Sequence, residues 1–538
     1  MAGNIDHILI NGRIRTLDDA TPQVSALALA GERIVAYGND DEMRSLGSVG
    51  TVIDNLEGRT ALPGFVDAHI HWRGTAEALH QVQLYDVTSR AQAVQRVAER
   101  AVTVTAGEWV IGYGWSQGAW DDPRFPTAQD LDAVTPNHPV LLRSRSGHAV
   151  WVNSLALRLA GVDAATMDPP GGAIQRDDAG EPTGIFFEWA AIDLINRHVP
   201  PITVDSLTRQ MTVAQDLALT HGMTGIHDFD WQDSFQALQV MREQGKLALR
   251  VLKQINAEYL ESLLHMQLRF GFGDNWLRIG SVKIFADGAL GPRTAAMIAP
   301  YEGEPDNVGV VVTEKATILD LVSRASAAGF PATVHAIGDR AVRDVLDVYE
   351  TVRAQEAARG IPRDARRHRI EHVQLIHPDD VNRLAELDII ASMQPIHATS
   401  DYPISDRYWG ARSAYAYNPR LQLDRGVRVA FGSDCPYDTL GILPGIHAAV
   451  TRRRVDGSPG AEGWTPSARL TVDEAVRAYT IGAAYAAGTE DRLGQLKPGF
   501  VADVVVLDQD PYHVDADALL SLQVMGTMVG GHWRYRNF

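Results

Sequence analysis

The sequence lacks the features that mark secreted and membrane-spanning proteins. Its single cysteine, Cys435, excludes a disulfide within the chain and indicates a reducing compartment. There is no apolar run of about 18 residues, the length that a transmembrane helix needs. The N-terminus, MAGNIDHILINGRI, has neither the basic start nor the long apolar segment of a signal peptide. We therefore expect a cytoplasmic protein.

Positive charge is also scarce relative to negative charge. The 538 residues include 49 Lys and Arg against 67 Asp and Glu, a net charge of −18 at pH 7. This balance argues against nucleic acid or a membrane as partner and leaves a small-molecule substrate as the expected one. The length exceeds one simple core, so a large domain with a smaller companion or insertion is expected. The oligomeric state stays open, with a homodimer as one alternative.

Both ends of the chain have the pattern of short strands separated by turns. Near the start, HILINGRIRTL, VSALALAGERIVAYG and TVIDNLEGRTALPG combine alternating apolar residues with Gly, Asn or Asp at the breaks. Near the other end, GQLKPGFVADVVVLDQDP and VMGTMVGGHWRY show the same pattern. Because chain ends often lie close together, residues 1–62 and 488–538 are predicted to form one small β-sandwich domain.

Between the ends, strand-like runs alternate with helical patterns such as RAVRDVLDVYETVRAQEAA, which predicts parallel βαβ units. Eight such units predict a (β/α)8 TIM barrel in residues 63–79 and 206–487. An open doubly wound sheet is the alternative, since it uses the same local signals. The eight predicted strands are GFVDAHIH (64–71), MTGIHD (223–228), LRVLKQI (249–255), RIGSVKIFAD (278–287), PATVHAIG (331–338), HRIEHVQL (368–375), IIASMQPIH (389–397) and VRVAFGSD (427–434).

The segment between the first two predicted strands is far longer than one crossover helix needs. It carries strand and helix signals of its own, including EWVIGYGW and GIFFEWAAIDLINRHV. We therefore predict an inserted, substrate-covering domain at 80–205. The helix that follows the first barrel strand is then expected near 204–221.

The first predicted strand lies in LPGFVDAHIHW (62–72), which has two histidines one residue apart. Residues i and i+2 of a strand face the same way, so His69 and His71 point together. Asp67 shares that face, where it is suited to accept a hydrogen bond from a histidine ring. By itself the pair is weak evidence for a metal site, because histidines on strands often satisfy only local hydrogen bonds.

Other predicted strand ends supply partners for this pair. His335 lies near the end of PATVHAIG, His372 near the end of HRIEHVQL, and Asp434 closes VRVAFGSD. Active sites of such barrels lie at the C-terminal ends of the strands, so we expect these side chains to meet there. Imidazole nitrogens and a carboxylate suit zinc or a similar divalent metal. His227 and His397 also end strands, and they either approach a substrate or form loop hydrogen bonds.

Lys283 lies on the fourth predicted strand, in RIGSVKIFAD. An ammonium beside metal ions is repelled, so this lysine lies away from the metal, pairs with an acid such as Asp287, or is converted to an anionic carbamate. The residues leave these alternatives open. His368 shares parity with His372 but lies about 13 Å deeper along the strand, so it is expected to be structural.

The predicted substrate-binding residues are Trp72, His148, Asn153, Arg293 and His397. Trp72 directly follows the histidine pair and is expected at the rim of the pocket. His148 and Asn153 lie in SGHAVWVNS, where Asn153 is equally suited to cap the next helix. Arg293 either clamps a substrate carboxylate or pairs with a nearby acid.

The chain resembles the metal-dependent amidohydrolase superfamily, in particular its family 3 group, which includes N-substituted formamide deformylases. The resemblance covers nearly the whole chain. LPGFVDAHIHW is similar to the superfamily's first-strand signature, and LGQLKPGFVADVVVLD to its return to the small β domain. VKIFADGALGPRTA, HAIGDRAV, RIEHVQ and FGSDCP resemble later blocks of the group. SGHAVWVNSLAL and GEPTGIFFE resemble blocks of its inserted domain.

This resemblance implies a metal site and roles for its residues. One or two divalent ions, in the first place zinc, are the expected cofactor. Asp434 is expected to bind metal and also to shuttle protons, while His335 or His372 helps to steady the oxyanion. Lys283 is expected to be a carboxylated lysine that bridges two metals. The implied metal ligands are His69, His71, Lys283, His335, His372 and Asp434.

Together these observations predict a metal-dependent hydrolase that cleaves an amide-type carbon–nitrogen bond, of the N-substituted amide or formamide class, with metal-activated hydroxide. Two alternatives are kept. One is a barrel that has lost catalysis and serves as a scaffold or binding protein. The other is a non-hydrolytic reaction, such as isomerisation or decarboxylation, at the same metal site.

Overall fold

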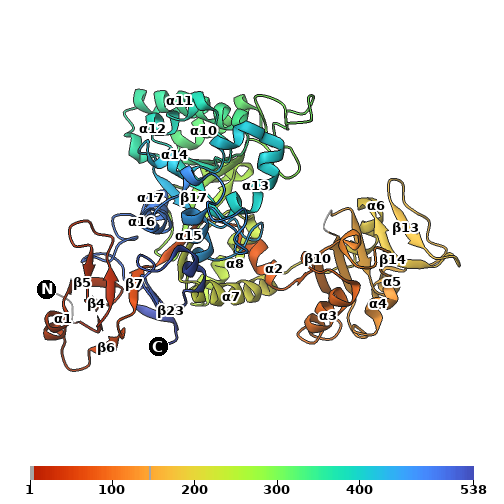
Figure 1. Ribbon diagram of the computed structural model, residues 1–538, viewed down its shortest axis with the longest axis horizontal. Helices are drawn as coiled ribbons and strands as arrows, with labels where there is room; N and C mark the ends of the chain where they lie inside the picture. The colour runs from red at the N-terminus through yellow and green to blue at the C-terminus, as the bar shows by residue number, and fades with distance from the viewer. Residues whose placement is uncertain (1–4, 145–146) are drawn as a thin grey trace. The chain divides into compact units, whose positions relative to one another are not determined.

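The computed structural model describes residues 5–144 and 147–538. Residues 1–4, 145 and 146 lie outside the described part, and among them is Ser146, the first residue of SGHAVWVNSLAL. The chain forms two compact units, one of residues 1–75 with 211–538 and one of residues 76–210. The inserted domain predicted at 80–205 lies within the second of these units. Figure 1 shows the elements of both units.

Eight parallel strands form the centre of the first unit, and each lies within or beside a predicted strand. Neighbouring strands follow the chain order, from β8 through β15 to β21, which an open doubly wound sheet does not do. The backbone N–H of Asp434 donates to the His69 carbonyl at 2.8 Å and links the two edges of the sheet. The barrel prediction is confirmed. The strands are β8 (Phe65–Ile70), β15 (Met223–Asp228), β16 (Arg250–Asn256), β17 (Leu277–Phe285), β18 (Ala332–Ala336), β19 (Arg369–His372), β20 (Ile390–Met393) and β21 (Val429–Phe431).

Helices alternate with these strands, as parallel βαβ units require. The helix expected near 204–221 is present as α7 (Val204–Thr220), but a shorter unpredicted helix, α2 (Trp72–Leu79), begins almost directly after β8. The remaining helices of this unit's barrel region are α8 (Gln232–Glu243), α9 (Leu260–His265), α10 (Lys315–Ala327), α11 (Asp339–Ala358), α12 (Arg383–Leu387), α13 (Pro395–Trp409), α14 (Pro419–Leu423), α15 (Ile442–Thr451), α16 (Val472–Arg477) and α17 (Ala483–Ala487).

Strands from both ends of the chain form two further sheets, in the orders β5-β4-β1-β6 and β24-β23-β22-β7-β2-β3. β7 pairs in parallel with β2 and antiparallel with β22, so strands from both ends share one sheet. Leu9 and Leu27 from one sheet and Val504 and Met528 from the other are fully buried in one core. The elements are β1 (His7–Ile10), β2 (Arg13–Arg15), β3 (Gln23–Val24), β4 (Ala26–Ala30), β5 (Arg33–Gly38), α1 (Asp40–Leu46), β6 (Val52–Asn55), β7 (Thr60–Pro63), β22 (Val504–Leu507), β23 (Val524–Val529) and β24 (His532–Arg536).

The second unit is built on one mixed sheet, in the order β13-β14-β12-β11-β10-β9. Three of its tryptophans, Trp115, Trp120 and Trp151, are buried in its core, with ring centroids 6.2–6.4 Å apart. Its elements are β9 (Val82–Gln83), α3 (Arg90–Ala101), β10 (Val110–Trp115), α4 (Ala128–Asp132), β11 (Val140–Ser144), β12 (Ala149–Val152), α5 (Ser154–Ala160), β13 (Ala173–Arg176), β14 (Pro182–Phe187) and α6 (Glu188–Asn196).

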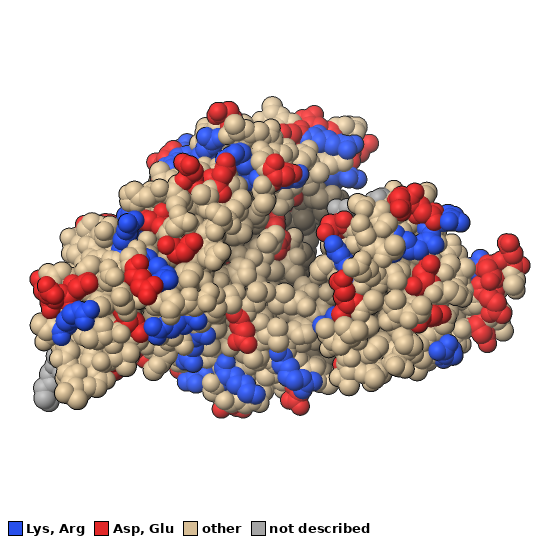
Figure 2. All heavy atoms as spheres, turned by 60° about the horizontal axis from the view of Figure 1, so that its bottom comes forward, with Lys and Arg blue, Asp and Glu red and all other residues tan. Residues whose placement is uncertain are grey.

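The length of the helices and the distribution of surface charge are two further features of the described chain. None of the described helices combines the length and the apolar character that crossing a bilayer requires. On the face shown in Figure 2, acidic and basic side chains are interspersed.

Candidate metal centre

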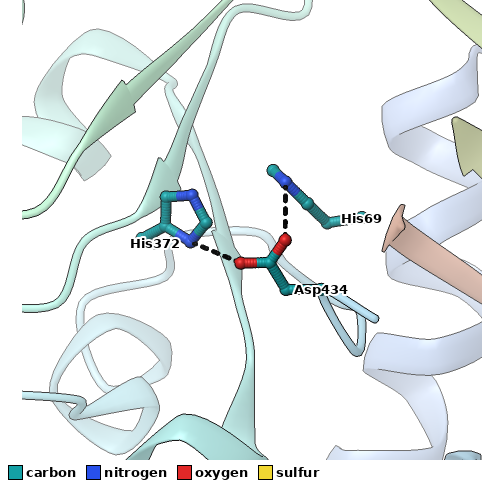
Figure 3. A group of neighbouring side chains, drawn as sticks. All are labelled: His69, His372 and Asp434. Carbon is teal, nitrogen blue, oxygen red and sulfur yellow. Dashed lines mark ion pairs between the residues drawn. The ribbon is translucent and has the colours of Figure 1, made fainter. Parts of the chain in front are cut away.

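Asp434 lies among histidines that come from different strand ends. Its carboxylate oxygens lie 3.5 Å from His69 Nε2, 3.4 Å from His71 Nε2 and 3.9 Å from His372 Nδ1. His397, in the first turn of α13, places its Nε2 3.7 Å from Asp434 Oδ2. Figure 3 shows His69 and His372 directed toward the two oxygens of Asp434. The fold thus brings five of the predicted site residues together, although they are widely spaced in the sequence.

Carboxylates orient the two histidines of the first strand. His69 Nδ1 lies 2.5 Å from Glu371 Oε2, and His71 Nδ1 lies 3.0 Å from Asp230 Oδ1. An ionised carboxylate only accepts hydrogen bonds, so each Nδ1 carries the proton and donates it. Each Nε2 then presents its lone pair toward Asp434. Hydrogen bonds of this kind fix the tautomer and the ring orientation of metal-ligating histidines.

The third histidine lies on a strained backbone and is held through Nδ1, the same nitrogen that lies 3.9 Å from Asp434. His372 Nδ1 lies 2.9 Å from Gln394 Oε1, which leaves Nε2 as the acceptor nitrogen of the ring. His372 has a φ of 77° and Asp434 a φ of 59°, values in the left-handed region that favours glycine. Such conformations cost about 1–3 kcal/mol each and concentrate at functional sites.

Asp67 holds the backbone around the site and does not contact a histidine ring. Its Oδ1 accepts the backbone N–H of His69 at 3.1 Å and that of Ser433 at 3.0 Å. The expected hydrogen bond from Asp67 to a ring is therefore absent, and Glu371 and Asp230 make the ring contacts. Asp67 acts as a clamp between the end of β8 and the segment that leads to Asp434.

Burial keeps two of the histidines neutral. It lowers the pKa of His69 to about 4 and lowers the pKa of His372 well below its usual range. Both rings therefore retain a lone pair at neutral pH. At His71 burial acts in the same direction, but the hydrogen bond to Asp230 outweighs it and raises the pKa of the ring.

The donor atoms at this site fit a divalent metal. His69, His372 and Asp434 each offer a ligand atom within 4.8 Å of the other two, and all three residues are buried. Asp434 Oδ1 is buried and has no hydrogen-bond partner in the described part of the chain. Leaving a carboxylate oxygen in that state is costly unless a cation pairs with it. Nitrogen and oxygen donors without a thiolate are typical of catalytic zinc and related ions.

His335 lies beside this group with one ring nitrogen already engaged. Its ring centroid is 4.6 Å from that of His372, but its Nε2 lies 2.9 Å from the Gly288 carbonyl oxygen. Burial lowers the pKa of His335 to about 3, so this ring is also neutral. The structure therefore places His335 at the site with only Nδ1 available as a donor atom to a metal.

Lys283 is buried between two aromatic rings. Its Nζ lies 4.8 Å from the centroid of Phe229 and 4.5 Å from that of Phe285. Among the described residues no acid forms an ion pair with it, and Asp287 instead accepts the backbone N–H groups of Ala296, Ile337 and Gly338. Burial lowers the pKa of Lys283 to about 8. The alternative of a Lys283–Asp287 pair is therefore excluded.

Two of the predicted substrate-binding residues have structural positions in the first unit. Trp72 begins α2 and is only 1% exposed, so it does not lie at a rim as expected. Its backbone N–H donates to Asp228 Oδ1 at 3.1 Å. Arg293 pairs with Glu304 at 2.6 Å, which is the acid-pairing alternative for this residue.

Two others, Asn153 and His148, lie in the second unit. Asn153 is buried and caps α5, where its Oδ1 accepts the N–H of Ala156 at 3.0 Å and that of Val140 at 3.1 Å. Its amide nitrogen donates to the His138 carbonyl at 2.8 Å, so this side chain is committed to the local fold. His148 is exposed, with its Nδ1 3.0 Å from Glu188 Oε2.

His227 and His368 have roles within the barrel. His227 is buried, and its Nδ1 accepts a hydrogen bond from the Arg369 guanidinium at 3.0 Å. His368 accepts the backbone N–H of Ala332 and lies 2.9 Å from Glu356, as expected for a structural histidine.

Glu371, Asp230 and Gln394 support the site and were not identified from the sequence. Signals for two of them are present in retrospect. Glu371 directly precedes a strand-end histidine in RIEH, and Asp230 belongs to HDFD, where two acids follow a strand. Gln394 has no comparable signal, because a lone amide near a strand end is common.

Comparison with known proteins gives consistent matches over most of the chain. A family model described as "Amidohydrolase family" matches residues 51–535. Putative amidohydrolase YtcJ of Bacillus subtilis is 34% identical over 91% of this chain and 91% of its own length. N-substituted formamide deformylase of Arthrobacter pascens is 30% identical over 98% of each chain. An uncharacterized metal-dependent hydrolase from Pyrococcus furiosus superposes with a TM-score of 0.76 at 30% identity, covering 94% of this chain and 99% of that one.

Proposed function

This chain belongs to the amidohydrolase family, and we propose that it is a metal-dependent hydrolase that cleaves an amide-type carbon–nitrogen bond. The observation that carries the proposal is Asp434 Oδ1, which is buried without a hydrogen bond among the described residues and faces the Nε2 atoms of His69 and His71. The similarity to an N-substituted formamide deformylase supports an N-substituted amide or formamide as the substrate class.

The side chains at this site have complementary roles in such a reaction. A bound divalent metal would polarise the scissile carbonyl and lower the pKa of water from about 15.7 toward 7. Asp434 accepts the proton of the attacking water and later delivers it to the departing amine nitrogen, a general acid–base role worth about 10²–10⁴ in rate. His335 or His372 helps to steady the developing oxyanion.

The proposed ligands are His69, His71, His335, His372 and Asp434, with zinc as the first choice and one or two ions. Lys283 is part of this proposal as a carboxylated lysine. Carbamate formation joins carbon dioxide to the neutral amine and releases one proton, and burial favours the neutral amine by lowering the pKa of Lys283 to about 8. His397 is proposed to contact the substrate, since it lies 3.7 Å from Asp434.

The test combines metal analysis with product analysis. Protein purified as expressed is assayed for bound metals and for hydrolysis of a panel of N-substituted formamides and amides in ¹⁸O-labelled water. We expect bound zinc or a similar ion, label in the acid product, and loss of both metal and turnover in His69→Ala. His265→Ala is the matched control, because His265 is exposed on α9.

Two outcomes would replace the proposal with one of its alternatives. A protein that is purified without metal and binds no zinc at micromolar levels would be a scaffold or binding protein. A product formed without the ¹⁸O label would indicate isomerisation or decarboxylation.

The proposal also covers the protein's setting. We propose a cytoplasmic enzyme that acts on a small molecule, without nucleic acid or membrane as partner, in keeping with the single cysteine and the net charge of −18. A homodimer is the proposed assembly, and light scattering on the eluting protein decides between dimer and monomer.

A further inference from the structure

A buried chain of hydrogen bonds leads away from His397. Gln374 Nε2 lies 3.3 Å from His397 Nδ1, and the Tyr417 hydroxyl lies 3.0 Å from Gln374 Oε1. The same hydroxyl lies 2.8 Å from Asp401 Oδ2. Gln374 and Tyr417 are buried, with 5% and 4% of their surfaces exposed. The four side chains therefore form a line that is shielded from water along most of its length.

The direction of these hydrogen bonds determines which nitrogen of His397 carries the proton. An amide nitrogen only donates, so Gln374 Nε2 must donate and His397 Nδ1 must accept. A neutral imidazole has one N–H, which then lies on Nε2. Because Nε2 is the nitrogen 3.7 Å from Asp434 Oδ2, His397 presents an N–H to the site. His69 and His71 present lone pairs to the same place.

Asp401, at the far end of this line of hydrogen bonds, must supply a proton for this arrangement. The Tyr417 hydroxyl has one hydrogen, and in this direction it goes to Gln374 Oε1. Asp401 must then be protonated and donate to the Tyr417 oxygen. Burial raises the pKa of Asp401, and the nearby Asp438 carboxylate raises it further. The His397 ring, the hydrogen bond from Tyr417 and the charge of Arg454 lower this pKa, but the net shift is upward.

We propose that Gln374, held by Tyr417 and Asp401, is a positioning residue that fixes His397 in the Nε2–H tautomer, and that this N–H donates to the carbonyl oxygen of the scissile amide. The inference rests on the proposed hydrolase function and adds to it the donor for the oxyanion. A small cavity of about 10 Å³, lined by Gln374, Gln394, His397 and Tyr417, adjoins the chain. A volume of that size holds about one water.

Substitutions at Gln374 either move the His397 proton to Nδ1 or remove the hydrogen bond that fixes its position. In Gln374→Glu the carboxylate only accepts, so the proton moves to Nδ1 and Nε2 loses its hydrogen. We expect kcat to fall about 10²–10³-fold with little change in KM, as for removal of one oxyanion donor. Gln374→Met keeps the size of the side chain without either hydrogen bond, so we expect a smaller fall. Asp401→Asn keeps the direction of the hydrogen bonds, because its amide donates to Tyr417 as a protonated Asp401 does. Gln239→Glu is the matched control for turnover, because it makes the same change at an exposed residue of α8.

The tautomer is also measured directly, without turnover. Nitrogen NMR of the metal-loaded protein with ¹⁵N-labelled histidine distinguishes proton-bearing from lone-pair ring nitrogens, and His397→Gln identifies the signals. We expect the proton on Nε2 in the wild type and in Asp401→Asn, and on Nδ1 in Gln374→Glu. A wild-type proton on Nδ1, or full turnover in Gln374→Glu with the tautomer reversed, overturns the inference. If the protein shows the expected tautomer and binds metal but hydrolyses no amide, the proposed function is wrong. The assignment of the His397 tautomer to the Gln374 hydrogen bond then still holds.

Discussion

Replacement of Glu371 by Gln tests whether the carboxylate behind His69 determines metal affinity. Glu371 and Arg369 are fully buried and joined by hydrogen bonds of 2.5 and 3.0 Å. Glu371 Oε1 also accepts from the Thr333 hydroxyl, while Oε2 accepts from His69 Nδ1 at 2.5 Å. Every lone pair of this carboxylate that the fold can reach is therefore in use.

A glutamine of the same shape has only one oxygen. If that oxygen remains with Thr333 and Arg369, the amide N–H₂ faces His69 Nδ1, which must then become an acceptor. The proton moves to Nε2, and the lone pair that faces Asp434 is lost. Loss of a partner of this kind lowers metal affinity about 10–100-fold, or about 1.4–2.7 kcal/mol. Removing one partner of a buried pair also lowers the free energy of unfolding by about 3–5 kcal/mol.

The assay is zinc affinity by competition with a chelator, together with urea unfolding of the same samples. Glu356→Gln is the matched control, because Glu356 is also buried and lies 2.9 Å from His368 and 2.8 Å from Arg353. We expect both variants to lose stability but only Glu371→Gln to lose zinc affinity. Equal zinc affinity in Glu371→Gln and the wild type, or equal losses in both variants, would refute the reasoning.

Three further predictions concern the packing around the site and the β-sandwich. Asp503→Asn breaks a buried bidentate ion pair with Arg250 at 2.6 and 3.0 Å, and we expect urea unfolding to show a loss of about 3–5 kcal/mol. Gly432→Ala places a Cβ 2.4 Å from His69 N and 2.8 Å from Asp67 Oδ1, so we expect about 1–3 kcal/mol of destabilisation and weaker zinc binding, where unchanged values would contradict this close approach. Despite burial, hydrogen bonds from His7 and Trp533 lower the pKa of Asp54 to about 2. The contribution of Asp54 to stability is therefore complete above about pH 4 and is lost as the pH falls toward 2. We expect Asp54→Asn to remove this part of the acid dependence of unfolding, and an unchanged acid profile would contradict the prediction.

The barrel was predictable because its strands are buried on both sides. Parallel strands covered by helices give nearly continuous apolar runs, and the residues of β21 (VAF) and β20 (IASM) are all buried. Such runs are visible in the sequence without any knowledge of the partner strands. The histidines and Asp434 were predictable as a group for a related reason, since strand ends in a barrel converge on one face.

The supporting contacts were not predictable, because they join residues that are distant in the sequence. Glu371 lies 302 positions from His69, and Asp230 lies 159 positions from His71. Strand periodicity pointed to Asp67 as the partner of a ring, but a short side chain can bond to the backbone two residues on, and here it does. The burial of Trp72 was missed for a similar reason, since nothing in HIHW shows that a helix begins there.

The junction between β7 and β8 has a consequence for the synthesis of the protein. Only Gly64 separates the sandwich strand from the strand that carries His69, and its N–H donates to the Asp503 carbonyl at 2.9 Å. β7 in turn pairs with β22, which lies near the end of the 538-residue chain. On the ribosome, His69 emerges early but its strand gains this anchor only when translation is almost complete. The junction beside His69 is therefore completed late, and chains from interrupted translation would lack the strand that anchors it.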